Sequence, residues 1–235
     1  MTKTRFPATV RFLLLVFLVS LASCGTGKGM SGGDVDDFKS SDFLGMVYDS
    51  RNRPCGGTVI RIGESENPVS SADVNGRFVI GDLARGPHTL RVSKEGFESQ
   101  DIAIDYTSRK QILYVRLVSQ ESLIDWAEES MESLEWAEAD ALLSRAEAVD
   151  PENSRYLAIR GTLDYLTGRY TTATAVWMRL IEKGHKDPYL CLMIADACEY
   201  GLRDTAAAAT WLERFLEYRD DGAVSDRLAA LRESD

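Results

Sequence analysis

The chain has 235 residues, of which 44% are hydrophobic and 27% are charged, a composition typical of globular proteins. The formal net charge of −10 is unevenly distributed, because residues 42–118 are balanced whereas residues 119–235 carry 24 acidic and 12 basic side chains. This acidity excludes a nucleic-acid-binding function, which needs a basic surface. It also argues against an anionic membrane as a surface partner of residues 119–235.

The beginning of the chain has the pattern of a secretion signal. Lys3, Arg5 and Arg11 precede an apolar run over residues 12–21, and small residues follow the run. The run is too short for a membrane-spanning helix, which needs ~20 apolar residues. We therefore predict a cleaved signal peptide over residues 1–23.

The signal ends in Leu21-Ala22-Ser23-Cys24, which resembles the bacterial lipobox. In that motif the cysteine is acylated and becomes the first residue of the mature protein. The resemblance implies a diacylglyceryl group and an N-terminal acyl chain (palmitate or similar) on Cys24, and stable anchoring needs more than one chain. It also implies a membrane-anchored lipoprotein of the bacterial cell envelope, facing the periplasm or the cell surface. An ordinary signal peptide cut near an incidental cysteine is the alternative.

Residues 24–41 are rich in glycine, serine and charged residues, and they show no hydrophobic periodicity. This composition indicates a flexible tether. A segment of this kind spans on the order of 20–25 Å root-mean-square.

Residues 42–118 change to an alternating apolar and polar pattern in short runs. Leu113, Val115 and Leu117, for example, share one face of an extended strand. Asn75-Gly76 supplies the positive φ angles of a tight hairpin turn. Short strands at regular spacing favour a β-sandwich or a barrel. The candidate strands are 43–49, 57–63, 68–73, 77–81, 88–93, 99–105 and 111–118.

Three segments of this region carry a family resemblance. Gly45-Met-Val-Tyr-Asp49, Asp73-Val-Asn-Gly-Arg-Phe78 and the segment Leu83–Val92 are similar to the carboxypeptidase regulatory-like domain. The resemblance implies a seven-stranded antiparallel β-sandwich of the transthyretin-like kind, with a non-catalytic role in folding, docking or spacing. The PEGA domain is a close competitor, because its Gly-x-His-x-Leu-x-Val ending matches residues 86–92.

Residues 119–235 repeat themselves at a spacing of 34 residues. Such a period predicts stacked helical pairs, which offer a groove to a partner. Three units begin at Gln120, Ser154 and Pro188, and residues 224–232 follow as an amphipathic capping helix. The recurring small positions are Ala127, Gly161 and Ala195, then Ala139, Ala173 and Ala207, and the recurring large positions are Leu143, Trp177 and Trp211.

These positions resemble the tetratricopeptide repeat (TPR), in which Gly or Ala lets two helices approach closely. The third unit is the weakest match, because Leu202 stands where a turn glycine is expected. The resemblance implies a peptide-binding groove lined by the first helix of each unit, and its acidic and apolar side chains suit a basic or amphipathic peptide. A merely solvated acidic face is the alternative. The implied lining is Glu121, Ile124, Glu128, Met131, Arg155, Ala158, Thr162, Tyr165, Tyr189, Leu192, Asp196 and Glu199.

The residues that could carry chemistry do not form a recognisable group in the sequence. His88 and His185 lack the spacing of a zinc-binding pair. Cys191 and Cys198 lie seven residues apart on one predicted helix, about 10.5 Å along its axis, which is too far for a disulfide bond. Cys55 has no evident partner. We predict no catalytic residue, no metal site and no cofactor.

The sequence therefore predicts a multidomain β + α protein that is not an enzyme. We expect an envelope lipoprotein that acts as a protein–protein interaction scaffold, with a protein or peptide as its partner. A structural spacer or subunit of an envelope assembly, a PEGA-like cell-surface binding module and an enzyme of unrecognised type are the alternatives. The expected parts are the signal peptide 1–23, the tether 24–41, the β-sandwich 42–118, and an α-solenoid 119–235 of about three helix pairs with a cap.

Overall fold

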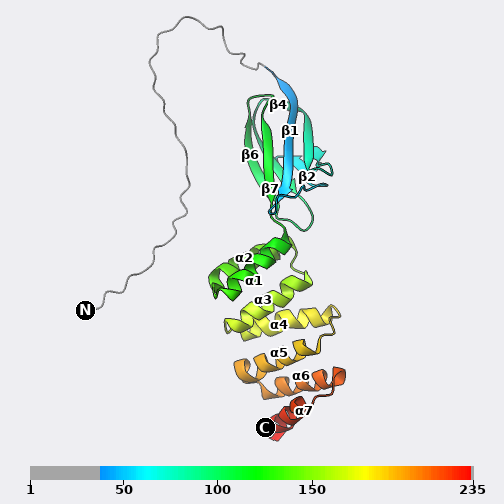
Figure 1. Ribbon diagram of the computed structural model, residues 1–235, viewed down its shortest axis with the longest axis vertical. Coiled ribbons are helices and arrows are strands. Elements are labelled where there is room, and N and C mark those ends of the chain that lie inside the picture. The colour runs from blue at the N-terminus through cyan, green and yellow to red at the C-terminus, as the bar shows by residue number, and fades with distance from the viewer. Residues whose placement is uncertain (1–37, 234–235) are drawn as a thin grey trace, which may run out of the picture. The chain divides into compact units, whose positions relative to one another are not determined.

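A computed structural model describes residues 38–233 of the chain, whose strands and helices are drawn in colour in Figure 1. The predicted signal peptide, Cys24 and most of the tether lie outside the described residues. Two hydrophobic cores extend from Phe38 to Leu117 and from Leu123 to Leu231. A fragment of residues 36–235 therefore contains every side chain of both cores.

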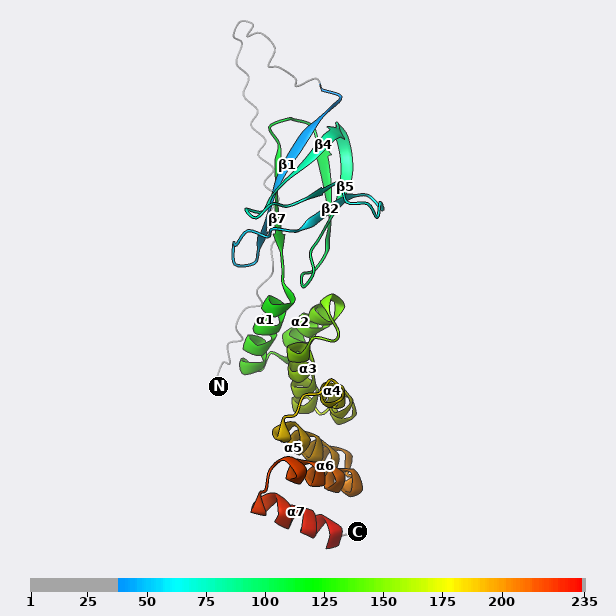
Figure 2. The ribbon, with the colours of Figure 1, turned by 90° about the vertical axis from the view of Figure 1, so that its right-hand side faces the viewer.

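The first core lies between two sheets, whose strand orders are β4-β1-β7 and β3-β2-β5-β6 (Figure 2). Neighbouring strands are antiparallel except β1 and β7, which run parallel with Leu44 opposite Ile112. This pair corrects the prediction of a wholly antiparallel sandwich, because side-chain alternation assigns residues to faces without fixing which strands are neighbours. The strands are β1 (Ser40–Asp49), β2 (Val59–Ile62), β3 (Ser70–Ser71), β4 (Arg77–Ala84), β5 (Gly86–Ser93), β6 (Gln100–Tyr106) and β7 (Ile112–Leu117).

Alternating side chains of both sheets fill this core. Phe43 on β1 and Leu90 on β5 are fully buried, and they stand for the inward positions of their strands. Phe38 is also buried, with its ring centroid 4.9 Å from that of Tyr106. The core of the sandwich therefore begins before residue 42.

The predicted turn at Asn75-Gly76 forms, but it connects the two sheets rather than two strands of one hairpin. The Asp73 carboxylate accepts hydrogen bonds from the backbone N–H groups of Asn75 (2.9 Å) and Arg77 (2.8 Å). Gly76 has a φ of +77°, and a Cβ at this position would lie 2.3 Å from the carbonyl oxygen of Val47. Only glycine fits this backbone conformation without strain.

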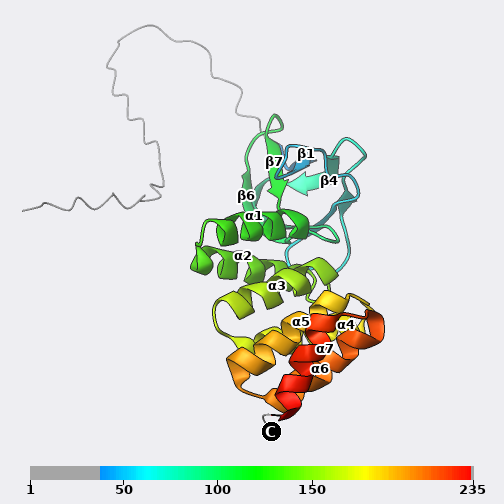
Figure 3. The ribbon, with the colours of Figure 1, turned by 60° about the horizontal axis from the view of Figure 1, so that its bottom comes forward.

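The second half of the described chain forms helices that stack in consecutive pairs (Figures 2 and 3). The first helices of the pairs begin at Gln120, Ser154 and Pro188, which confirms the spacing of 34 residues. Each begins after an N-cap residue whose side chain accepts a hydrogen bond from a backbone N–H of the first turn. The N-cap residues are Ser119, Asn153 and Asp187. The helices are α1 (Gln120–Glu132), α2 (Trp136–Val149), α3 (Ser154–Leu166), α4 (Tyr170–Glu182), α5 (Pro188–Asp196), α6 (Thr205–Tyr218) and α7 (Gly222–Glu233).

Small residues lie where the two helices of a pair cross, as the repeat pattern predicts. Gly161 on α3 faces Trp177 on α4, and a Cβ added to Gly161 would lie 2.2 Å from the indole Nε1. Ala127 and Ala195, at the equivalent positions of the other units, are fully buried. The small side chains let the helix axes approach closely enough for the large ones to fill the space beside them.

The third unit contains one residue more than the other two. Helix α5 continues directly into a π-helix, η1 (Ala197–Leu202), whose wider turn absorbs an extra residue. Arg203 then takes the left-handed conformation, with a φ of 60°, that Leu134 and Gly168 have at the corresponding turns. The turn glycine expected at Leu202 is therefore displaced by one position.

This insertion corrects two positions of the repeat alignment. Ala208 and Leu212 are fully buried, whereas Ala207 and Trp211 are only partly buried. The small and large core positions of α6 therefore belong to Ala208 and Leu212. A strict spacing of 34 residues selects the wrong residues, because a π-turn changes the register without changing the hydrophobic pattern.

A buried carboxylate joins the first two helix pairs. Asp164 on α3 accepts a hydrogen bond from Arg169 Nε (2.9 Å), and its second oxygen faces Arg160 Nε at 3.4 Å. Both arginines also reach Asp140 on α2, at 2.9 Å from Arg169 Nη2 and 3.1 Å from Arg160 Nη1. Four charged side chains from two pairs thus form one network.

The sandwich and the helical array are joined by a connection of two residues, Val118 and Ser119. The backbone N–H of Glu98 donates to the carbonyl oxygen of Val118 at 2.9 Å. The Glu98 carboxylate accepts two hydrogen bonds from Arg145 on α2, at 2.9 and 2.7 Å. These contacts supplement the covalent link between the two parts.

Candidate functional site

The helices α1, α3 and α5 together with η1 carry the predicted groove residues, and their accessible side chains are called the first-helix face below. Glu121 and Tyr189 are exposed. Ile124 is fully buried, because it lies next to Leu123 on the inward side of α1, and its assignment to the groove is corrected. The half-buried predicted residues are Glu128, Met131, Arg155, Ala158, Thr162, Tyr165, Leu192, Asp196 and Glu199.

Arg155 on α3 bridges three carboxylates of α1. Its guanidinium forms ion pairs with Glu121 and Glu128, and its Nη1 lies 2.8 Å from Asp125 Oδ1. Asp125 in turn accepts a hydrogen bond of 2.6 Å from Arg51 in the sandwich. Partial burial opposes the charge of Arg155, but the hydrogen bond to Asp125 and the nearby carboxylates outweigh it and raise the pKa of Arg155.

Arg227 on α7 makes a second cluster of the same kind. Its Nη2 lies 2.7 Å from Asp196 Oδ1 and 2.6 Å from Glu199 Oε2. The guanidinium also lies over the Tyr200 ring, 5.3 Å from its centroid. Burial lowers the pKa of Arg227, but the two carboxylates outweigh this effect, so the net pKa is raised.

The two clusters lie on either side of an uncharged step between α3 and α5. A cavity of about 350 Å³ opens there, and Ala158, Thr162, Trp177 and Met193 contribute to its lining. Arg155 lies at the same cavity and belongs to the first cluster. Within residues 38–233, ion pairs bridge α1 to α3 and α5–η1 to α7, but none bridges α3 to α5.

The two predicted groove tyrosines also have structural partners. The Tyr165 ring lies 5.5 Å from Tyr170 and 5.8 Å from Trp177, and burial together with the charge of Asp196 raises its pKa. The Tyr189 hydroxyl accepts a hydrogen bond of 2.6 Å from Arg219. Substitution of either tyrosine would therefore disturb packing as well as binding.

Three residues of the face are absent from the sequence prediction. Asp125 lies four residues after Glu121, on the same side of α1, so helical spacing could have identified it. Arg51 and Arg227 come from a sandwich loop and from the capping helix. No sequence signal links them to the face, because their contacts depend on the tertiary fold.

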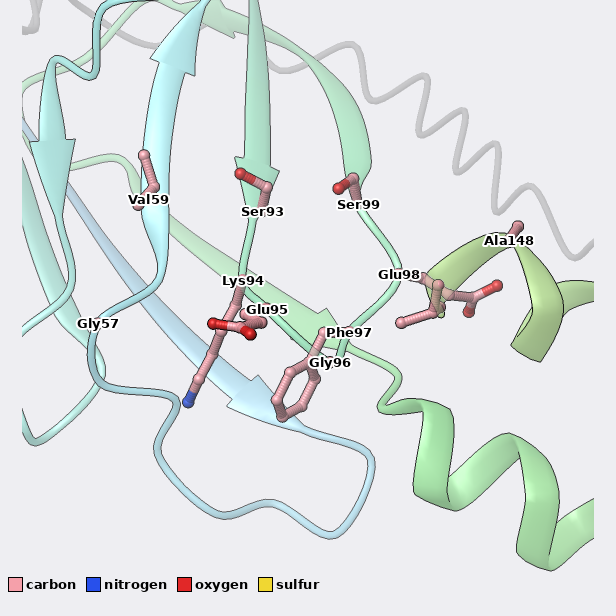
Figure 4. A pocket seen from close by; sticks show the side chains of 11 residues that line it. Gly57, Val59, Ser93, Lys94, Glu95, Gly96, Phe97, Glu98, Ser99 and Ala148 are labelled. Carbon is pink, nitrogen blue, oxygen red and sulfur yellow. The ribbon is translucent and has the colours of Figure 1, made fainter. Parts of the chain in front are cut away.

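A second cleft lies where the β5–β6 loop meets the end of α2, with a volume of about 710 Å³ (Figure 4). Ser93 and Ser99 stand at neighbouring strand ends in this view, and Glu98 extends toward the helix that carries Ala148. Lys94 Nζ lies 5.0 Å from the centroid of the Phe97 ring. Because Glu98 is already paired with Arg145, the main charged group of this cleft serves the contact between sandwich and array.

The described residues contain no group of three His, Cys, Asp or Glu side chains placed to hold a metal ion. His88 Nε2 lies 2.7 Å from the carbonyl oxygen of Ala84, and His185 Nε2 lies 2.8 Å from Ser154 Oγ. The three described cysteines are free and buried, and burial raises the pKa of each thiol. They therefore remain protonated and poorly nucleophilic near neutral pH.

Between residues 38 and 233, the structure contains no helix with the length and apolar character needed to cross a bilayer.

These features define a β-sheet region joined to an array of paired helices with a charged and partly open face. The chain matches no family model and no curated protein. Among solved structures it is similar to the N-terminal domain of stress-induced protein-1 from C. elegans, with 13% identity and a TM-score of 0.43 over 48% of this chain and 94% of that one.

Two further solved structures are similar over about half of this chain. The first TPR of Spaghetti (RPAP3), bound to an HSP90 peptide, has 14% identity and a TM-score of 0.43, over 49% of this chain and 91% of that one. The Arabidopsis OM64 TPR domain has 15% identity and a TM-score of 0.43, over 49% of this chain and 96% of that one.

Proposed function

We propose that this protein is a membrane-anchored envelope lipoprotein that acts as a non-catalytic scaffold for another protein. The lipobox-like sequence at Cys24 supports the anchor, and the first-helix face supports the binding role. The observation that carries the binding role is the arrangement of this face, in which two acidic clusters bridged by arginine flank an uncharged cavity.

The chemistry of the face favours one kind of ligand. The two clusters contain five carboxylates and three arginines, so they retain a negative surplus. Negative charge attracts a basic segment and orients it on approach. The cavity between the clusters is at the small end of ligand sites, which span roughly 300–1,000 Å³, and therefore suits one large apolar side chain. We propose a peptide segment with an apolar residue between basic ones.

The test of this proposal fills the cavity. Ala158 lines it, and Ala158→Arg would place a bulky cation between the two clusters. Fragment 36–235 with this substitution should lose at least tenfold in affinity for a partner captured from envelope extract. Ala175→Arg, at an exposed position of α4, is the matched control and should bind normally. Equal capture by both variants would contradict the assignment of the site.

The anchor requires a separate test. Cys24→Ala removes the side chain that the lipobox resemblance assigns to acylation. We expect the variant to leave the membrane fraction after cell lysis. Unchanged fractionation would refute the anchor and would leave the binding proposal untouched.

A structural spacer is the second candidate function. It is supported by the two-residue connection between β7 and α1 and by the Glu98–Arg145 pair across the junction. On this alternative, a photo-crosslinker placed at Ala158 in cells should link the protein only to its own copies. Crosslinking to a different protein would favour the scaffold.

A further inference from the structure

The two sheets differ in the side chains that they turn away from the core. On the outer face of β5 and β6, Thr89, Arg91, Asp101 and Asp105 are exposed, and Arg91 pairs with Asp101 at 2.8 Å. This polar pattern is the one expected where a sheet faces water. The outer face of the other sheet departs from it.

Strands β4, β1 and β7 turn five apolar side chains outward, which together are called the apolar sheet face below. The backbone register places Leu44 of β1 between Val79 of β4 and Ile112 of β7, and it places Met46 beside Tyr114. Leu44, Val79, Ile112 and Tyr114 are 43–64% exposed. A groove of about 680 Å³ is lined by Leu44, Met46, Val79 and Ile112, with Ser70 and Ser71.

Positive charge accompanies this face. Arg77 lies opposite Met46 on one side, and Arg116 lies opposite Tyr48 on the other. The acidic side chains at its strand ends are Asp42 and Asp82, where β1 begins. The Asp73 carboxylate, which also lines the groove, is occupied by two backbone N–H groups of the β3–β4 turn. Apolar and basic side chains therefore alternate across the centre of the sheet.

We propose that the apolar sheet face rests on the surface of an anionic lipid bilayer, namely the membrane in which the acylated Cys24 is held. This inference rests on the anchor of the proposed function. Aromatic and aliphatic side chains enter the interface between headgroups and acyl chains, while arginines pair with lipid phosphates. The array, with its acidic surplus, is repelled by the same surface and stays in solvent.

The length of the connecting chain favours a lipid surface as the occupant. Thirteen residues separate Cys24 from Phe38, and a flexible chain of this length spans about 20 Å root-mean-square. Such a tether keeps the sheet at an effective concentration on the order of millimolar relative to the membrane, so a weak contact suffices. A stable dimer buries about 800 Å² on each partner, which five partly exposed side chains do not provide.

The experiment supplies its own anchor. Fragment 36–235 with an N-terminal hexahistidine tag is held on vesicles of nickel-chelating lipid, phosphatidylethanolamine and phosphatidylglycerol that also contain a lipid-borne fluorescence quencher. An environment-sensitive dye is attached through Tyr114→Cys on the apolar sheet face or, as the matched control, through Thr89→Cys on the polar face. The native cysteines of the fragment are buried, and the unsubstituted fragment shows how much dye they take up.

We expect quenching of the dye at position 114 and little at position 89. In a second measurement without nickel lipid, Arg77→Gln with Arg116→Gln should lower the vesicle partition coefficient by more than tenfold, as the loss of two cations near an anionic surface implies. Both substitutions lie at exposed positions, and circular dichroism checks that the variants fold.

Equal quenching at both positions would overturn the proposal. It would also be overturned if sedimentation showed a dimer that Leu44→Ser abolishes, because a second copy would then cover the face. Neither outcome depends on Cys24, since the vesicle supplies the anchor. Failure of the Cys24→Ala fractionation test would instead refute the anchor while these measurements remained interpretable.

Discussion

The buried carboxylate of Asp164 offers a direct test of how the helix pairs are held together. Its side chain is only 2% exposed, and its partners Arg160 and Arg169 are 20% and 41% exposed. Removing one partner of a buried ion pair costs ~3–5 kcal/mol, because an uncompensated charge remains. Arg169 is half in solvent and Arg160 keeps Asp140 at 3.1 Å, so the lower end of this range applies. We expect Asp164→Ala to lower the free energy of unfolding by about 3 kcal/mol.

Urea denaturation followed by far-ultraviolet circular dichroism measures this loss. The control is Asp140→Ala in the same network, whose side chain is 40% exposed. An ion pair of that exposure contributes at most ~1 kcal/mol, so the control should fall well short of Asp164→Ala. Equal losses for the two variants, or a loss below about 1 kcal/mol for Asp164→Ala, would refute the view that this carboxylate couples the first two pairs.

Three further predictions test the array. Gly161→Ala should lower the unfolding free energy by ~1–3 kcal/mol in thermal melts, because the new methyl group collides with the buried Trp177 ring. Leu212→Ala should cost ~2–5 kcal/mol, and more than Trp211→Ala does, if the π-helix shifts the register; a larger loss for Trp211→Ala would restore the simple period. Burial raises the pKa of Tyr156 to about 12, whereas an unfolded tyrosine ionises near 10, so stability should fall as the pH rises from about 10 to 12. Tyr156→Phe should reduce this alkaline loss in equilibrium unfolding.

The sequence predicts the helix pairs well because their starts depend on local signals. Gln120, Ser154 and Pro188 each follow a capping residue, and the small residues at the crossings recur with them. The π-helix at Ala197–Leu202 escaped prediction, because an inserted residue changes the hydrogen-bond register and leaves the apolar pattern nearly intact. The positions after it were therefore assigned one residue early.

The candidate site was predictable only in part, because its geometry depends on residues distant in sequence. Helical spacing places Glu121 and Glu128 on one side of α1, but it places Ile124 there as well, although that side chain is buried. The Arg51–Asp125 pair joins residues 74 apart, and no pattern within either segment indicates it. Likewise, alternation identified the outward side chains of β1 and β7 without showing that these strands are neighbours.

The two-residue connection between β7 and α1 gives the array a preferred direction of opening. Each helix pair of such an array contacts only its neighbours, so local stability depends on how many sides are covered. The first pair is held on one side by the sandwich through the Glu98–Arg145 contact, whereas α7 has a neighbour on one side only. Amide hydrogen exchange should therefore proceed fastest at α7 and slow progressively toward α1. A load pulling between the membrane and a bound partner would unzip the chain from its free end first.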